Sequence, residues 1–194
     1  MAEWKFFDGD IAPFTDDEFY REREAAHHME QIGHRDRLIA VLAFAMHAKK
    51  HLNCLTFSDL GAGDGGLIQE ARFQGLDIWG YDMQPSNVDY ARSVRKVPVE
   101  LVNFETDGGI VFGDASILSE VLEHVSDPHG LVRNLPSNVI IASSPYLENP
   151  DNRYEFHNWA WDMDGYAELI KQGGYEIVRH ETAWFSQVIL GVRR

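Results

Sequence analysis

Three side chains that could bind a metal ion or move a proton lie within SEVLEHVSDP, residues 119–128. Glu120, Glu123 and His124 directly follow the apolar run 115–118. If the chain turns helically there, positions i, i+3 and i+4 share one face. Two carboxylates and an imidazole on one turn indicate a site for a divalent metal ion. The alternative is a solvated helix start, because acidic residues are favoured there.

A second group of candidate residues lies in FSDLGAGDGGLIQEA, residues 57–71. Gly61, Gly63 and Gly66 fit the dinucleotide spacing G-x-G-x-x-G, whereas Asp59, Gly61, Gly63 and Gly65 fit D-x-G-x-G-x-G. Both patterns need glycine, because the backbone must turn sharply and approach a ligand closely. A carboxylate at position 59 suits a ligand with an ammonium group, and Asp64 would face a pyrophosphate unfavourably. The two charges favour S-adenosylmethionine over a nicotinamide cofactor.

Further cofactor contacts are expected at the ends of the next two apolar runs. Asp82 ends the second run, where a carboxylate can accept hydrogen bonds from both ribose hydroxyls. It could instead cap the helix that begins near Ser86. Met83 lies where it could cover an adenine face. Asn103 could bind the adenine amino group or form an ordinary turn at the strand end.

Short apolar runs alternate with helical patterns along most of the chain. Such alternation predicts a mostly parallel sheet with helices on both faces. The strand candidates are 55–60, 77–81, 99–104, 115–118, 139–142, 175–178 and 188–192, and the connecting helix candidates are 67–73, 86–94, 130–135 and 164–172. No helix separates the last two strands, so they should pair antiparallel. The expected fold is an α/β, Rossmann-like doubly wound sheet of seven strands with a C-terminal antiparallel hairpin.

Composition narrows the classes of partner. The 194 residues carry a formal net charge of −14, which disfavours nucleic acid and anionic membranes. One cysteine excludes an internal disulfide and any multi-cysteine zinc site. No apolar run approaches the roughly 18 residues of a membrane span. A soluble cytoplasmic protein without a membrane partner is expected. The sequence does not indicate the oligomeric state.

DLGAGDGG, GYDMQPSNVDYAR and DASILSEVLEHVSDP, in this order and spacing, resemble the class I S-adenosylmethionine-dependent methyltransferases. The resemblance covers the chain from about Thr56 to its end and implies a last strand inserted into the sheet. We therefore expect one methyltransferase domain over residues 1–194. A helical lid region would occupy 1–51, with one helical pattern running from an N-cap at Thr15 to about His51, and the cofactor-binding core would occupy 52–194.

The E-x-x-E-H motif followed by D-P is similar to ubiquinone-biosynthesis O-methyltransferases and to small-RNA 3′-terminal 2′-O-methyltransferases. Both resemblances imply a divalent metal at this motif. The RNA family adds a histidine after the fifth strand, which corresponds to His157 in FHNWAWDMDGY. The implied metal ligands are Glu120, Glu123, His124 and His157, a set that suits magnesium, manganese, iron or zinc. Alternatively, His124 or His157 acts as a general base without metal, or the group is structural.

The resulting hypothesis is a methyltransferase that uses S-adenosylmethionine to methylate a hydroxyl-bearing small molecule, with metal assistance. An RNA 3′-end 2′-O-methyltransferase is the enzymatic alternative, although no basic stripe for RNA is visible. A non-catalytic cofactor-binding regulator or partner subunit is the alternative of another class, and an NAD-dependent oxidoreductase is more remote.

Overall fold

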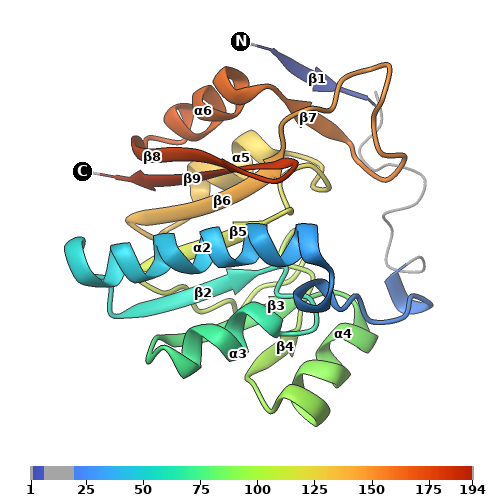
Figure 1. Ribbon diagram of the computed structural model, residues 1–194, viewed down its shortest axis with the longest axis vertical. Helices are drawn as coiled ribbons and strands as arrows, with labels where there is room; N and C mark the ends of the chain where they lie inside the picture. The colour runs from blue at the N-terminus through green and yellow to red at the C-terminus, as the bar shows by residue number, and fades with distance from the viewer. Residues whose placement is uncertain (1, 7–19, 194) are drawn as a thin grey trace.

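The computed structural model describes residues 2–6 and 20–193 and contains the predicted seven-stranded sheet. The strand order is β4-β3-β2-β5-β6-β9-β8 (Figure 1). Strands β2 to β6 run parallel, and β9 lies antiparallel between β6 and β8, which confirms the inserted last strand. The strands are β2 (Thr56–Leu60), β3 (Asp77–Asp82), β4 (Val99–Leu101), β5 (Ala115–Ser119), β6 (Val139–Pro145), β8 (Glu176–Ala183) and β9 (Ser186–Val192).

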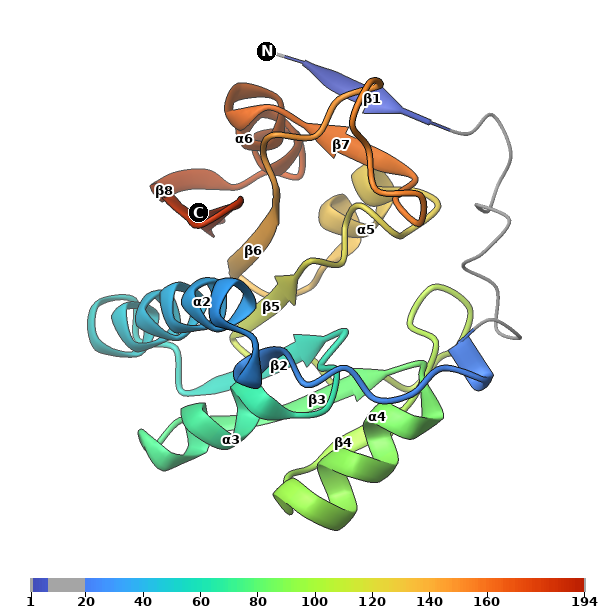
Figure 2. The same ribbon diagram turned by 45° about the vertical axis from the view of Figure 1, so that its right-hand side comes forward.

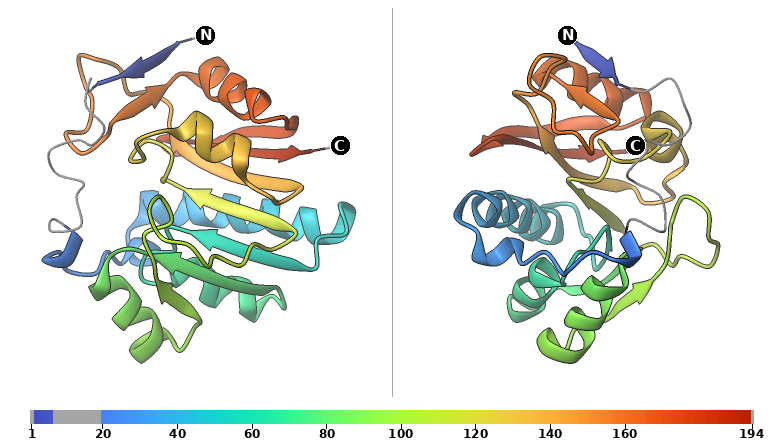
Figure 3. Two further views of the ribbon diagram at one scale, coloured as in Figure 1. Left: turned by 180° about the vertical axis from the view of Figure 1, so that it is seen from behind. Right: turned by 90° about the vertical axis from the view of Figure 1, so that its right-hand side faces the viewer.

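Helices cover both faces of the sheet, because its central strands carry apolar side chains on both sides. In β5, Ile117 packs in the core beneath α2 (Ile32–His51) and α3 (Gly66–Phe73), whereas its neighbour Leu118 packs in the core beneath α5 (Pro128–Asn134) and α6 (Met163–Gln172). Figure 3 shows α5 and α2 on opposite sides of the sheet. Within the described part of the chain, no helix combines the length and the apolar character needed to cross a bilayer.

The helix after β3 has an irregular second half. It begins as α4 (Pro85–Tyr90) and continues as one π-helical segment, η2 (Ala91–Arg95). The sequence predicted one helix over 86–94, so the element was predicted and its change of helical type was not. The other three connecting helices begin or end within two residues of their predicted bounds.

The prediction of one helix from Thr15 to about His51 is wrong over residues 22–31, whereas residues 32–51 are helical as predicted and residues 15–19 lie outside the described residues. Residues 22–27 are irregular, and a 3₁₀ turn, η1 (His28–Glu30), precedes α2. Side chains around α4 occupy backbone groups that a helix would need: Gln84 Nε2 donates to the Glu24 carbonyl at 2.8 Å, and Ala26 N–H donates to Asn87 Oδ1 at 3.1 Å. Residues 20–31, which we call the strap, cross the open end of the sheet beside α4 (Figure 2).

A second, two-stranded sheet was not predicted. It pairs β1 (Glu3–Lys5) antiparallel with β7 (Trp159–Trp161). Trp161 Nε1 donates to Glu3 Oε2 at 2.7 Å, which fastens the start of the chain to the segment between β6 and α6. This small sheet fixes the segment that carries His157.

The strand order reverses between β2 and β5, since the chain proceeds outward from β2 through β3 to β4 and then returns to β5. Loops that follow β2 and β5 therefore diverge and leave a crevice at the carboxyl ends of the strands. The glycine loop follows β2, and the E-x-x-E-H motif follows β5.

Candidate functional site

A cavity of about 760 Å³ lies at this crevice. Its lining includes nine of the eleven residues predicted for the site: Asp59, Gly61, Gly63, Asp82, Met83, Asn103, Glu120, His124 and His157. The other two, Gly65 and Glu123, lie behind the cavity wall, with Glu123 fully buried. The structure thus brings the residues predicted to bind the cofactor and those of the E-x-x-E-H motif to one cavity.

The glycines of the loop have different tasks. Gly63 adopts φ +56°, and a Cβ built on it would meet nothing within 4 Å, so the loop is open there for a ligand. Gly65 adopts φ +77°, and its Cβ would lie 2.6 Å from Val97 Cγ2 and 3.0 Å from Ala91 Cβ. Gly63 allows close approach to the cavity, whereas Gly65 allows close packing of the loop against η2.

Asp59, near the end of β2, is a buried carboxylate with 1% exposure. Its Oδ1 has no hydrogen-bond partner among residues 2–6 and 20–193. Burial and, to a smaller extent, the nearby Asp82 raise the pKa of this carboxyl to about 7, while Arg37 opposes the shift. An unpaired buried carboxylate is costly, so this position favours a ligand that brings a positive charge.

Asp82, at the end of β3, organises the loops around it. Its Oδ2 accepts from Gly63 N–H at 2.7 Å, and its Oδ1 accepts from Gln84 N–H at 2.8 Å and Asn87 Nδ2 at 3.2 Å. Burial raises its pKa, and these hydrogen bonds oppose that shift. Asp82 therefore supports the start of α4, as the capping alternative proposed, while its carboxylate also faces the cavity.

Asn103 forms a turn after β4. Its N–H donates to Asp107 Oδ2 at 2.9 Å, and its Oδ1 accepts from Glu105 N–H at 3.1 Å. The ordinary strand-end turn is therefore present, although the residue also lines the cavity. Its contact with adenine stays a prediction.

Asp64 links the glycine loop to the strap and to η2. Its Oδ2 accepts from Arg95 Nη2 at 2.5 Å and lies 3.0 Å from His27 Nδ1, and its Oδ1 accepts from Gly66 N–H. The carboxylate that would repel a pyrophosphate is thus paired with a cation of η2 and with the strap.

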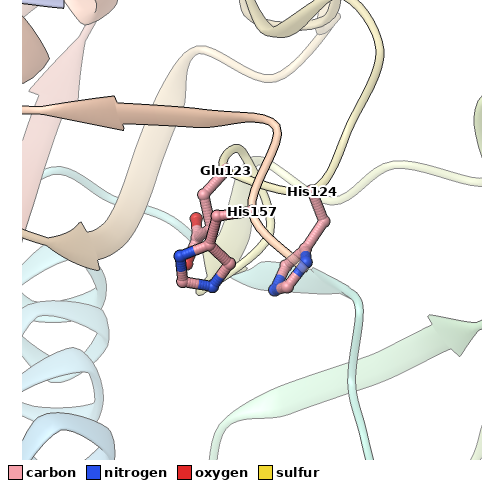
Figure 4. Close-up of side chains that lie close together, drawn as sticks. All are labelled: Glu123, His124 and His157. Atoms are coloured by element: carbon pink, nitrogen blue, oxygen red, sulfur yellow. The ribbon is translucent and has the colours of Figure 1, made fainter. Parts of the chain in front are cut away.

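Glu123, His124 and His157 form a compact group of potential metal ligands. One ligand atom from each lies within 4.8 Å of the others. Figure 4 shows the three side chains converging from two segments, the loop after β5 and the segment before β7. The two histidines lie 33 positions apart in the sequence, and the fold brings them together.

Backbone contacts hold these two segments together. The Glu123 carbonyl accepts from Asn158 N–H at 2.7 Å and from Trp159 N–H at 3.1 Å, and Asn158 Nδ2 donates to the His124 carbonyl at 2.6 Å. The two imidazole rings meet edge to face with centroids 4.6 Å apart. Hydrogen bonds to backbone groups therefore fix the relative positions of the three side chains.

The hydrogen bonds of the two histidines use the same ring nitrogen. His124 Nδ1 lies 3.1 Å from the Phe156 carbonyl, an acceptor, and His157 Nδ1 lies 2.6 Å from Glu148 Oε2. Each Nδ1 is then the donor, which leaves Nε2 as the nitrogen for a ligand. Metal-binding histidines commonly donate their other ring N–H to a carbonyl or carboxylate in this way.

Burial dominates the electrostatics of the group. It raises the pKa of Glu123 well above its usual value, with Glu120 adding to the shift. Burial and, to a smaller extent, the neighbouring His157 lower the pKa of His124 to about 3. Neither carboxylate oxygen of Glu123 has a hydrogen-bond partner in the described ranges. A neutral imidazole beside an unpaired buried carboxylate fits a cation.

Glu120 lies apart from this group. The predicted helical turn does not form over 120–124, because Glu120 adopts φ +57° and the chain makes only a tight turn, with His124 N–H donating to the Val121 carbonyl at 3.0 Å. The Glu120 carboxylate lies 3.5 Å from Arg37 Nη1 and accepts from Ser143 Oγ at 3.1 Å. It faces the same cavity from beside the three-residue group.

Most other cavity residues were not identified from the sequence, among them Arg37, His34 and His28. Arg37 is 1% exposed, although it is charged. A signal existed, because Arg37 falls four residues before Val41 and seven before Phe44, on the buried stripe of α2. His28 and His34 stack with centroids 4.4 Å apart, and burial lowers the pKa of His28 to about 3.

No protein-family model and no curated protein sequence matches the chain. Several solved structures match the chain. NodS, an N-methyltransferase of Bradyrhizobium japonicum WM9 in complex with S-adenosylhomocysteine, matches with a TM-score of 0.69 at 10% identity, covering 94% of this chain and 98% of that one.

Two further structures match at higher identity. Magnesium protoporphyrin IX methyltransferase (ChlM) of Synechocystis PCC 6803 with bound S-adenosylmethionine has a TM-score of 0.65 at 19% identity, over 90% of this chain and 88% of that one. The methyltransferase domain of bacterial CtHen1-C has a TM-score of 0.57 at 19% identity, over 81% and 97%. This chain therefore has the fold of the class I S-adenosylmethionine-dependent methyltransferases.

Proposed function

We propose that this protein is an S-adenosylmethionine-dependent methyltransferase that methylates a hydroxyl group of a small molecule with the help of a divalent metal ion. One observation carries the proposal: the glycine loop, with the carboxylates of Asp59 and Asp64, lines the same cavity as His124 and His157. A cofactor site and a ligand group for an acceptor thus lie in the same space.

The chain's own residues provide a site for each part of the cofactor. Asp59 holds the ammonium group, and the buried guanidinium of Arg37 binds the carboxylate of the same amino-acid tail. Asp82 accepts from the ribose hydroxyls, and Gly63 lets the backbone approach them. S-adenosylmethionine supplies the methyl group on a sulfonium sulfur. Asn103 and Met83 line the same cavity and would contact the adenine.

The ligand group fits a divalent cation. The fit rests on Glu123, whose two unpartnered oxygens are buried beside the two imidazoles, and on the Nδ1 contacts that orient both rings. Glu123, His124 and His157 would hold the ion, and Glu120, the fourth predicted ligand, lines the same cavity. A bound cation would lower the pKa of the acceptor hydroxyl that attacks the methyl group. The protein mainly positions the two reactants.

The general-base alternative for His124 is less well supported. An efficient general base has a pKa near the working pH, and burial gives His124 a pKa of about 3. Its Nδ1 is also occupied by the Phe156 carbonyl, so only Nε2 could take a proton. Such low basicity suits ligation better than proton abstraction.

The charge of the cavity favours a small acceptor. Its described lining carries six carboxylates and two guanidinium groups: Asp59, Asp64, Asp82, Glu105, Glu120 and Glu148 against Arg23 and Arg37. Phosphates of a nucleic acid would meet an acidic wall as well as a net charge of −14. A neutral molecule with vicinal hydroxyls would not be repelled by these charges.

RNA 3′-end 2′-O-methylation remains the second candidate. The E-x-x-E-H motif with His157 supports it, since the fold brings His157 to His124 as that resemblance requires. A terminal ribose also presents vicinal hydroxyls, so the ligand group alone does not choose between the two acceptors.

Methyl transfer from radiolabelled S-adenosylmethionine tests the proposal. We expect metal-dependent labelling of catechol- or polyol-type acceptors that chelators abolish. Labelling of a short RNA whose terminal ribose is intact, and not of one oxidised by periodate, would instead select the RNA candidate. Cofactor binding without transfer to any acceptor would leave the regulator hypothesis.

A further inference from the structure

Arg37 is a buried cation with incomplete pairing. It projects from α2 into the cavity wall with 1% exposure. Its Nη1 donates to His34 Nδ1 at 3.2 Å and lies 3.5 Å from Glu120 Oε2, and its Nε has no hydrogen-bond partner among the residues that the structure describes. A buried guanidinium needs an anion, and Glu120 is the carboxylate in contact with it.

Glu120 is held in place by β6. Its φ of +57° is uncommon for a residue with a Cβ. Its N–H donates to the Ser143 carbonyl at 3.1 Å, and Ser143 Oγ donates to its Oε1 at 3.1 Å. The second carboxylate oxygen is left to Arg37. The hydrogen bonds to β6 and the contact with Arg37 thus hold Glu120 between β6 and α2.

The two members of this ion pair face different ligands. Arg37 and Asp59 line the same cavity, and the charge of Arg37 lowers the pKa of that carboxyl. Together they offer a cation and an anion to the zwitterionic tail of the cofactor. Glu120 lies three positions before Glu123 in the loop after β5 and lines the same cavity as His124 and His157, and its charge raises the pKa of Glu123. Each ligand can therefore compete for one half of the same pair.

Resting on the proposed function, we infer that the Arg37–Glu120 ion pair couples the two sites: the cofactor carboxylate draws Arg37 away from Glu120, a divalent cation draws Glu120 away from Arg37, and whichever binds first spares the second the cost of breaking the pair. Coupling between sites is reciprocal, and it commonly changes affinity by about 5- to 150-fold. Cofactor and metal ion should therefore bind with positive cooperativity.

Calorimetric titration with S-adenosylhomocysteine, with and without saturating Co²⁺, measures the coupling. We expect the wild-type Kd to fall roughly tenfold with Co²⁺, and the Co²⁺ Kd, followed by visible absorption, to fall by the same factor with S-adenosylhomocysteine. 5′-Methylthioadenosine lacks the amino-acid carboxylate, so its Kd should change less than about twofold. This comparison needs no variant.

Glu120→Gln tests the role of Glu120 in the coupling between cofactor and metal ion. It should bind S-adenosylhomocysteine without metal about as tightly as the wild type does with metal, and Co²⁺ should no longer change that Kd. Glu105→Gln is the charge-matched control, because Glu105 lines the same cavity but bonds to Ser126, and it should keep the coupling.

The outcomes separate the inference from the proposed function. Independent binding of S-adenosylhomocysteine and Co²⁺ to the wild type, or coupling that survives in Glu120→Gln, would overturn the inference alone. Failure of the wild type to bind S-adenosylhomocysteine or Co²⁺ would overturn both.

Discussion

The cofactor half and the metal-ligand half of the cavity are stabilised in different ways. Asp82 in the cofactor half accepts three hydrogen bonds from the protein, and Asp64 pairs with Arg95 and His27. Glu123 in the other half is equally buried, yet both of its oxygens lack a partner within the described ranges. Asp82 and Asp64 therefore serve the protein's own loops, whereas Glu123, like Asp59 Oδ1 in the cofactor half, is left for a ligand.

This difference shows which charges the fold needs. A satisfied buried carboxylate supports structure, so its loss should lower stability together with binding. A buried carboxylate without hydrogen-bond partners destabilises the folded state, so its removal should reduce function without reducing stability. Variants in each half can therefore be sorted by comparing the two readouts.

The largest effect is expected for Glu123→Gln. Outer-shell partners of a metal site already contribute about 10–100-fold, so loss of a ligand should reduce methyl transfer about 100-fold or more. The melting temperature should stay the same or rise, because a buried unpaired charge disappears. Steady-state transfer rates, metal content and thermal melts measure this.

Glu155→Gln is the matched control, since Glu155 is an exposed acid on the segment that carries His157. It should leave metal content and rate unchanged. A Glu123→Gln protein with normal metal content and rate would remove the ligand group from the mechanism.

A smaller effect is expected at Asp59, with a defined pH dependence. With a pKa of about 7, this carboxyl is about one-tenth ionised at pH 6 and nine-tenths at pH 8. Only the ionised form holds an ammonium, so S-adenosylhomocysteine should bind up to about tenfold more tightly at pH 8 than at pH 6. The raised pKa of Asp82 acts in the same direction. Calorimetry across this range measures the effect.

Asp59→Asn should weaken binding at pH 8 by roughly 10–100-fold and flatten this dependence. Because the folded pKa exceeds the unfolded value of about 4, ionisation destabilises the fold progressively from pH 4 to 7 and fully above it. The variant should therefore melt higher than the wild type at pH 8 and nearly the same at pH 4. Lower stability at pH 8 would contradict the assignment of an unpaired carboxylate.

The smallest effects should separate two neighbouring glycines. Gly65→Ala meets Val97 and Ala91 as well as the positive-φ penalty, so it should cost about 2–4 kcal/mol of folding free energy. Gly63→Ala meets no atom, so it should cost only about 1 kcal/mol but weaken S-adenosylhomocysteine binding. Urea unfolding and calorimetry compare the pair, and equal losses of stability would show that Gly63 also packs tightly.

The main sheet and its helices could be predicted because each element carries its own apolar pattern. The pairing of β1 with β7 could not, since each strand has three residues and the partners lie more than 150 positions apart. The strap was mistaken for helix, because its backbone bonds go to side chains of α4 that sequence spacing does not reveal.

The site was predicted unevenly for a similar reason. Nine of the eleven predicted residues line one cavity, because their positions follow from strand ends. Glu120 was expected to share a helical face with Glu123, and the positive φ that turns it toward Arg37 has no signal in the sequence. The partner itself, Arg37, depends on how α2 packs.

Calorimetric titration of the wild-type protein with S-adenosylhomocysteine and, separately, with NAD tests the central claim most directly. We predict saturable binding of one S-adenosylhomocysteine per chain, lost in Asp82→Ala, and no heat from NAD. Saturable NAD binding with no response to S-adenosylhomocysteine would contradict it.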